Sequence, residues 1–255
     1  MKTIILAGGL GTRLQEETTV KPKPMVEIGG QPMLWHIMKI YAMYGHKDFA
    51  IAMGYKSEVI RSYFLNYYYH HCNMTVNLGT GEIEIEGGDH DDWKVYLADT
   101  GDKTQTGGRI KRFASWIGDQ TFMFTYGDGV SDINIDELIK FHYKHGKLAT
   151  VTAIRPPFRL GSIVTEGDSI LKFIEKPMIG ENWASGGFFV LEPEVLEYIE
   201  SDDIQWEKHP LEQLANDGQL VAYRHEGFWQ CMDTIRDVQY LEGLWAQGKA
   251  PWKIW

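Results

Sequence analysis

A glycine-rich segment near the amino terminus holds the most distinctive group of residues for chemistry. It consists of Leu6, Ala7, Gly8, Gly9, Leu10, Gly11, Thr12 and Arg13. Glycines let backbone N–H groups approach a ligand closely and turn toward one anion. Lys23, between two prolines, adds a second positive charge to that of Arg13. The segment therefore predicts a nucleoside triphosphate site, with a plain strand-to-helix turn carrying surface cations as the alternative.

Two familiar phosphate-binding loops are excluded by spacing. The Walker pattern ends in Gly-Lys-Ser/Thr, whereas Gly11 is followed here by Thr12 and Arg13. The dinucleotide fingerprint has a third glycine three residues after the second, and this segment has none. The segment is neither a P-loop nor a typical dehydrogenase loop.

Two aspartates further along the chain are candidate metal ligands. Asp128 follows an apolar run at 121–126 and lies between two glycines, which places it at the carboxyl edge of a buried parallel strand. A carboxylate there suits Mg²⁺, and an Asx-turn is the alternative. Asp233 precedes Thr234 and an apolar helical face, so it is either an ordinary helix N-cap or a second ligand. The sequence does not show whether the two aspartates are close.

Two further groups have both a functional and a structural interpretation. Glu175 and Lys176 end an apolar strand before a proline, where they could contact a sugar and a phosphate or simply finish the strand. Gly107, Gly108 and Arg109 begin a helix whose free N–H groups could face a ligand or belong to a plain helix start.

The elements that must position these residues alternate between strand and helix. Apolar runs predict strands at 2–7, 49–53, 121–126 and 148–154, and periodic segments predict helices at 32–44, 57–70, 106–116, 135–144, 193–200, 207–217 and 234–247. We expect an α/β fold with a mostly parallel, doubly wound, Rossmann-like mixed sheet. Residues 74–101 predict a small β insertion, in which 89–92 form a solvated loop tip rather than a metal site. The part beyond 155 is mixed α+β.

Composition excludes several classes of function. The net charge of −10 argues against nucleic acid as a partner. No apolar run is long enough to span a membrane, and no secretory signal is evident. Cys72 and Cys231 form no disulfide or metal framework, so a cytoplasmic location is expected. The aromatic tail 251–255 suggests a subunit contact.

The motifs, taken in order, match a known family. Residues 6–14 with Lys21-Pro22-Lys23-Pro24-Met25, then 126–130, Glu175-Lys176-Pro177 and 186–190, resemble the signature of sugar-1-phosphate nucleotidyltransferases over essentially the whole chain. Residues 100–109, 228–234 and 250–253 resemble the subgroup that transfers a cytidylyl group. The resemblance implies the nucleotide-diphospho-sugar transferase fold as one domain, with a nucleotide half at 1–130 and a sugar-phosphate half with oligomer contacts at 131–255.

The resemblance also implies roles for individual residues. Residues 6–13, Lys23 and the segment from Thr104 to Arg109, with Gly107 and Gly108, would bind the nucleotide, and Asp128 and Asp233 would hold Mg²⁺. The sugar phosphate would contact Tyr126, Gly127, Glu175, Lys176, Ser185 and Gly186. The family commonly has Asn where Ser185 stands and Pro where Glu16 stands. Arg13, Lys23 and Asp128 would be the catalytic residues.

The implied reaction is transfer of a cytidylyl group from CTP to glucose 1-phosphate, giving CDP-glucose for the deoxysugars of bacterial surface polysaccharides such as the O-antigen. The sugar phosphate is already largely dianionic near pH 7, with a second pKa of about 6, so in-line attack on the α-phosphorus needs no general base. UTP or dTTP in place of CTP, or a non-catalytic regulatory relative, are the alternatives. Intact Arg13, Lys23 and Asp128 argue against the latter, and a glycosyltransferase usually has a second Asp two residues after the first. A symmetric homo-oligomer, a hexamer or another assembly, is expected.

Overall fold

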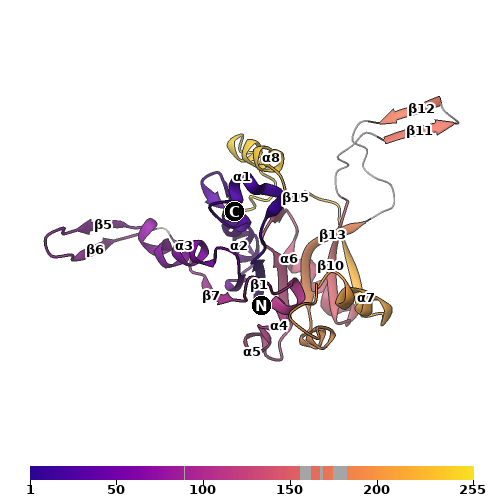
Figure 1. The fold of residues 1–255 in the computed structure, drawn as a ribbon, viewed down its shortest axis with the longest axis horizontal. Coiled ribbons are helices and arrows are strands. Elements are labelled where there is room, and N and C mark those ends of the chain that lie inside the picture. The colour runs from indigo at the N-terminus through magenta and orange to yellow at the C-terminus, as the bar shows by residue number, and fades with distance from the viewer. Residues whose placement is uncertain (89, 156–161, 167–168, 175–182) are drawn as a thin grey trace.

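A seven-stranded mixed sheet forms the centre of the computed structural model, which describes residues 1–88, 90–155, 162–166, 169–174 and 183–255 (Figure 1). The strand order is β14-β10-β13-β8-β1-β4-β7. In chain order these strands are β1 (Lys2–Ala7), β4 (Asp48–Met53), β7 (Lys94–Asp99), β8 (Phe122–Tyr126), β10 (Ala149–Ile154), β13 (Ala184–Leu191) and β14 (Leu220–His225).

The pairing confirms the predicted doubly wound, mostly parallel sheet. β1 pairs in parallel with both β4 and β8, β4 with β7, and β10 with β14. Only β13 runs antiparallel to its neighbours β8 and β10, which makes the sheet mixed. Residues 4–7 of β1 form a continuous apolar run because this central strand is covered on both faces.

Helices cover the two faces of the sheet and enclose two cores. The α-helices are α1 (Gln15–Thr18), α2 (Met33–Met43), α3 (Ser57–His70), α4 (Thr106–Lys111), α5 (Ala114–Ile117), α6 (Ile135–His145), α7 (His209–Asn216) and α8 (Ile235–Ala246). Ile5 and Ala7 of β1 face a core shared with α2, α6 and α8, whereas Ile4 and Leu6 face a core shared with α4, α5 and α7. Alternate residues of one strand thus supply both layers.

Short elements complete the chain and correct two predictions. In the described residues the 3₁₀ turns are η1 (Thr12–Leu14), η2 (Lys23–Met25) and η3 (Pro193–Tyr198). The short strands are β2 (Glu27–Ile28), β3 (Gln31–Pro32), β5 (Asn73–Val76), β6 (Ile83–Glu86), β9 (Gly129–Ser131), β11 (Ser162–Glu166), β12 (Ser169–Ile174) and β15 (Trp229–Cys231). The single helix predicted over 106–116 is two, because the chain turns at Arg112 and Phe113 and buries the Phe113 ring. The helix predicted over 193–200 is the 3₁₀ turn η3. Among the described residues, none of the helices combines the length and apolar character needed to cross a bilayer.

The solvated loop tip predicted at 89–92 is wrong for Asp91, while Asp89 lies outside the described residues. The Asp91 carboxylate accepts hydrogen bonds from Lys39 Nζ at 2.6 Å, Tyr67 Oη at 2.6 Å and Trp35 Nε1 at 3.0 Å. Asp91 therefore fastens this loop to α2 and α3. In the described part of the chain no three His, Cys, Asp or Glu side chains are grouped so that they could hold a metal ion.

The carboxyl-terminal tail packs on its own chain, and the predicted subunit contact stays a prediction. Trp252 is fully buried and its indole Nε1 donates to His36 Nδ1 at 3.3 Å. His36 Nε2 in turn bonds the carbonyl of Ile28 at 2.8 Å. Trp255 packs edge-on against Trp35 with ring centroids 5.6 Å apart. The aromatic residues of the tail thus close one face of α2.

The buried His36 predicts an acid-sensitive fold. Burial lowers the pKa of His36 from 6.5 to about 4, and its neutral ring accepts the Trp252 hydrogen bond. The unfolded chain therefore binds more protons than the folded one between those two values, so stability falls as the pH drops from 6.5 toward 4. We expect a loss of about 2 kcal/mol from this group between pH 7 and pH 5. Urea unfolding at both pH values measures it, and His36→Gln, which cannot titrate, should show a smaller loss; an equal loss would contradict the assignment.

Candidate active site

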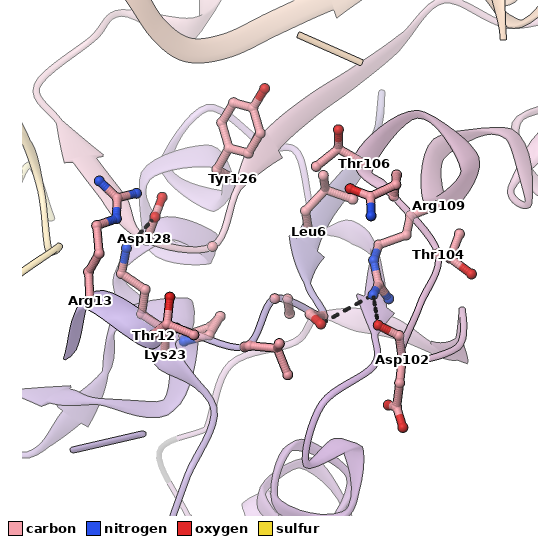
Figure 2. Close-up of a pocket in the computed structure, with 18 residues that line it drawn as sticks. Leu6, Thr12, Arg13, Lys23, Asp102, Thr104, Thr106, Arg109, Tyr126 and Asp128 are labelled. Atoms are coloured by element: carbon pink, nitrogen blue, oxygen red, sulfur yellow. Dashed lines mark hydrogen bonds and ion pairs between the residues drawn. The ribbon is translucent and has the colours of Figure 1, made fainter. Parts of the chain in front are cut away.

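Four charged side chains from three distant parts of the sequence form one network beside the glycine-rich loop. Lys23 Nζ lies 2.7 Å from Asp128 Oδ2 and also pairs with Asp233 Oδ1. Arg13 Nη1 lies 2.7 Å from Asp233 Oδ2. Figure 2 shows Arg13, Lys23 and Asp128 directed toward one another at one side of the pocket. The structure thus places the predicted cations and the predicted metal ligands together.

The pairing of two very short strands brings the aspartates together. β9 and β15 are antiparallel, with Gly129 opposite Cys231. The amide of Met232 also donates to the carbonyl of Asp128 at 2.8 Å. Asp128 directly precedes β9, and Asp233 follows β15 with one residue, Met232, in between, so both lie at the same end of this ladder.

The structure shows that Asp233 does not cap helix α8. The residue that caps α8 is Thr234, whose side chain accepts from the Asp237 amide in a capping box. The Asp233 carboxylate takes no part in this cap and pairs with Lys23 and Arg13 instead. The ordinary N-cap interpretation is therefore wrong.

Lys23 and Asp233 stay ionised near neutral pH. Burial opposes the charge of Lys23, but Asp128 and Asp233 outweigh it and the pKa of Lys23 is raised. Burial likewise disfavours the Asp233 carboxylate, yet Lys23 and Arg13 lower its pKa. Burial together with Asp233 raises the pKa of the neighbouring Cys231 thiol to about 12, so this thiol is not a nucleophile near pH 7.

The network opens onto a cavity of about 440 Å³, a size typical of small-molecule sites. Its lining consists of Leu6, Ala7, Gly8, Gly9, Leu10, Gly11, Thr12, Arg13, Lys23, Pro24, Asp102, Thr104, Gln105, Thr106, Arg109, Tyr126, Gly127 and Asp128. All eight residues of the predicted loop are among them. The cavity lies at the carboxyl ends of β1 and β8, where ligands bind in open α/β sheets.

Arg109 lies against the loop rather than projecting freely into the cavity. Its guanidinium is buried and donates to the carbonyls of Met53 at 3.0 Å, Gly8 at 3.2 Å and Asp102 at 3.4 Å. Figure 2 shows Arg109 between the loop and the Asp102 segment. The predicted nucleotide-binding residue thus holds two walls of the cavity together.

Gly107 and Gly108 face away from the cavity. A Cβ at Gly107 would lie 2.7 Å from the carbonyl oxygen of Ile204, and one at Gly108 would lie 2.5 Å from Asp202 Cα. Both glycines let α4 approach the segment 202–204 closely. They are absent from the cavity lining, unlike the neighbouring Thr104.

The predicted sugar-phosphate residues divide into two groups. Tyr126 and Asp128 join Ser185 and Gly186 around a smaller cavity of about 60 Å³ that shares a wall with the larger one. Trp229 closes it, and its Nε1 donates to the carbonyl of Gly186 at 2.7 Å. Gly127 lines the larger cavity only, while Glu175 and Lys176 lie outside the described residues.

Glu207 is a residue at this site that the sequence did not single out. Its carboxylate accepts from Tyr126 Oη at 2.5 Å and from Thr106 Oγ1 at 2.6 Å. Burial and the charge of Glu207 raise the pKa of Tyr126, so its phenol stays protonated. Glu207 thereby connects the end of β8 with the start of α4 across the cavity rim. A lone exposed Glu just before α7 gives no local pattern that would have identified it.

The contact between Gly8 and Arg109 gives a testable prediction. A Cβ at Gly8 would lie 2.2 Å from Arg109 Nη1, so Gly8→Ala must displace the guanidinium or the loop. Such overpacking costs about 1–3 kcal/mol, and we expect a nucleoside triphosphate to bind about tenfold or more weakly in titration calorimetry. Since both changes disrupt one contact, the Gly8→Ala/Arg109→Ala double variant should lose little more nucleotide affinity than the single variant with the larger loss. Additive losses would contradict this account.

Comparison with known proteins relates the chain to a family of transferases. The family model described as nucleotidyl transferase matches residues 2–234. Two curated relatives named glucose-1-phosphate cytidylyltransferase, from Salmonella typhi and from Salmonella typhimurium, are each 53% identical, with both chains covered completely.

Solved structures support the fold at much lower identity. The chain of UDP-glucose pyrophosphorylase complexed with UDP-glucose matches with a TM-score of 0.69 and 18% identity, over 97% of this chain and 98% of that one. The nucleotide-diphospho-sugar transferase fold expected from the sequence is therefore confirmed.

Proposed function

The chain belongs to the nucleotidyl transferase family, and we propose that it transfers a cytidylyl group from CTP to glucose 1-phosphate, giving CDP-glucose and pyrophosphate. One observation carries the proposal. Arg13, Lys23, Asp128 and Asp233, which come from three separate parts of the chain, meet in one network at the mouth of the loop cavity. The full-length relatives at 53% identity that are named for this activity support the choice of nucleotide and sugar.

The charges around the cavity favour the participation of a divalent cation. Arg13, Lys23 and Arg109 are balanced by Asp102, Asp128 and Asp233, so these side chains leave the site close to neutral. A triphosphate and a sugar phosphate together bring several negative charges. An additional cation would reduce their mutual repulsion.

Asp128 and Asp233 fit the requirements of Mg²⁺. Both offer hard carboxylate oxygens, and one ammonium group contacts them simultaneously, so a single small cation could do the same. Enzymes of this family generally use a divalent metal. When bound, Mg²⁺ would neutralise charge on the phosphates and stabilise the developing charge of the leaving pyrophosphate.

The chain's own residues bind and orient the two substrates. The loop amides at 8–11 and the side chains of Arg13 and Lys23 hold the triphosphate, with charge-assisted hydrogen bonds to its oxygens. Glucose 1-phosphate binds beside Ser185 and Gly186, where the smaller cavity meets the larger one at Tyr126 and Asp128, and its phosphate oxygen attacks the α-phosphorus in line. Because that phosphate is already dianionic, no side chain has to remove a proton. Positioning and charge neutralisation then account for catalysis.

The remaining features of the proposal concern the whole chain. Residues 1–130 form the nucleotide half of a single domain, and 131–255 form the sugar-phosphate half with the oligomer contacts. The protein acts in the cytoplasm as a homo-oligomer and binds no nucleic acid, in keeping with its charge of −10. Its product supplies the deoxysugars of surface polysaccharides such as the O-antigen.

Pyrophosphate release tests the proposed reaction. Purified protein with Mg²⁺ is combined with each of CTP, UTP, dTTP and GTP and with a panel of sugar 1-phosphates. We expect the highest kcat/KM with CTP and glucose 1-phosphate. Release with UTP alone would contradict the cytidylyl assignment, and no release with any pair would contradict the enzyme assignment. Omitting the sugar phosphate serves as the control for CTP hydrolysis.

A further inference from the structure

The segment 201–208, which connects η3 to α7, lies along the start of α4. The carbonyl of Asp202 accepts from the amide of Gln105 at 2.8 Å, and the carbonyl of Ile204 accepts from the amide of Gly107 at 2.9 Å. These two N–H groups at a helix start are therefore engaged within the chain. Because both contacts are made by backbone atoms, they hold the start of α4 whatever side chains the segment carries.

Trp206 anchors this segment in the core. Its indole is fully buried and packs against the rings of Phe124 and Phe189, whose centroids are 6.2 Å and 6.0 Å away. The next residue, Glu207, is exposed, yet its carboxylate accepts two hydrogen bonds, one of them from Tyr126 Oη at 2.5 Å. Ordering a glutamate side chain costs conformational entropy. The anchored backbone before Glu207 lowers that cost, because it limits the positions that the carboxylate can reach.

The Tyr126 ring lies where the two cavities of the site meet, since Tyr126 lines both of them. On one side the ring lies against Gly187, whose φ is +79° and where a Cβ would lie 2.6 Å from Tyr126 Cδ2, so only glycine fits. Among the described residues, Glu207 is the hydrogen-bond partner of the phenol. Figure 2 shows the ring between Asp128 and Thr106, with its hydroxyl directed away from Asp128. The backbone of β13 and one carboxylate thus fix the ring.

We propose that Glu207 is a positioning residue for the proposed reaction, and that it holds the Tyr126 ring in the wall between the nucleotide cavity and the sugar-phosphate cavity. The inference rests on the proposed function for the identity of the two substrates. A displacement of about 1 Å at a reacting centre can lower a rate about 100-fold. A Tyr126 ring that moved into the smaller cavity would displace the sugar phosphate from the α-phosphorus.

Glu207 acts through Tyr126, because Glu207 itself lines neither cavity. Its carboxylate also contacts Thr106 in the nucleotide wall, but the backbone bonds of Gln105 and Gly107 hold that wall as well. Within the described part of the chain, the Tyr126 phenol has no second hydrogen bond of this kind. Loss of Glu207 should therefore disturb the sugar-phosphate site more than the nucleotide site.

Initial rates of pyrophosphate release, measured with the nucleotide that the wild type accepts, test this role. We expect Glu207→Ala to raise the KM for glucose 1-phosphate about tenfold and to lower kcat, while the KM for the nucleotide stays within about twofold. Glu207→Gln should restore the wild-type values, because its amide oxygen still accepts from Tyr126. Glu212→Ala is the matched control, since Glu212 is also exposed and lies in the first turn of α7. Equal rises in both KM values, or no rescue by Glu207→Gln, would overturn the proposal.

A double variant tests whether the effect passes through Tyr126. Tyr126→Phe removes the phenol that Glu207 binds, so it should show the same rise in the KM for glucose 1-phosphate. Adding Glu207→Ala to Tyr126→Phe should then cause little further loss of kcat/KM. Additive losses would mean that Glu207 acts by another route, and the proposal would be wrong.

Fluorine NMR of protein labelled with 3-fluorotyrosine follows the ring without turnover. The Tyr126 signal is the one that disappears in Tyr126→Phe. We expect it to move toward the position of free 3-fluorotyrosine in Glu207→Ala, because a released ring averages over several environments, and to stay in place in Glu207→Gln and Glu212→Ala. An unmoved signal in Glu207→Ala would contradict the proposal. Wild-type protein that releases no pyrophosphate would contradict the proposed function instead, and the NMR signal would still decide whether Glu207 fixes the ring.

Discussion

Lys23→Met is expected to lower kcat/KM for CTP and glucose 1-phosphate by at least about 100-fold while tightening the binding of a divalent metal ion in the absence of nucleotide. The first effect follows from the loss of a positive charge that would stabilise the transition state, which is worth about 3 kcal/mol or more. The second follows from the contacts of Lys23. Its ammonium group pairs with Asp128 and Asp233 at once, so a metal ion entering alone must displace it.

Removing the Lys23 ammonium leaves two carboxylates with one fewer cation. A hydrogen bond to a charged group contributes about 1.5–3 kcal/mol, so the metal should bind about tenfold or more tightly to the variant. Mn²⁺ titration followed by electron paramagnetic resonance measures this affinity without turnover. In the wild type, nucleotide phosphates would draw Lys23 away, so adding CTP should strengthen Mn²⁺ binding more in the wild type than in the variant.

Lys21→Met is the matched control for Lys23. Lys21 lies two residues away and its Nζ is 3.4 Å from Glu27, outside the network. We expect wild-type kinetics and wild-type Mn²⁺ affinity from it. If Lys23→Met retained near-wild-type kcat/KM, or bound Mn²⁺ no more tightly than Lys21→Met, the role given to Lys23 would be wrong.

The parts of the site that the sequence could predict are those determined by local patterns. The glycine-rich loop follows a buried apolar strand, and parallel α/β order brings the loop and Asp128 to the same edge of the sheet. The proximity of Asp128 and Asp233 could not be predicted from residue patterns, because it depends on pairing between two three-residue strands about a hundred positions apart. Such short strands have little periodicity of their own.

Several residues pack in a way that differs from the role their local sequence suggests. Gly107 and Gly108 are adjacent to Arg109 in sequence and suggest a ligand-binding helix start, yet they lie against the segment 202–204 because only glycine fits that approach. Likewise the aromatic tail has the composition of a subunit contact, while its Trp252 fills a space beside His36. Composition predicts that a segment is apolar, but it does not predict which part of the molecule packs against that segment.

Asp128→Asn and Asp233→Asn are each expected to lower kcat/KM by at least about 100-fold, because each removes one of the two carboxylates that would hold Mg²⁺. Their effects on stability should differ. Asp233 pairs with both Arg13 and Lys23 and its side chain is 11% exposed, whereas Asp128 pairs with Lys23 and is 31% exposed. Asp233→Asn should therefore lower the free energy of unfolding by about 1–3 kcal/mol, and Asp128→Asn by less.

Urea unfolding and Mn²⁺ titration of the two variants separate the structural role of each carboxylate from its catalytic role. Asp136→Asn is the control, since this exposed aspartate lies in the first turn of α6 away from the network. We expect Asp136→Asn to retain activity and Mn²⁺ affinity. Its free energy of unfolding should fall by about 0.3–1 kcal/mol at most, because a negative charge near the helix N-terminus is lost. Metal affinity that survives in both Asp128→Asn and Asp233→Asn would mean that the ion is held elsewhere, and the pairing of these two residues by Lys23 would then serve stability alone.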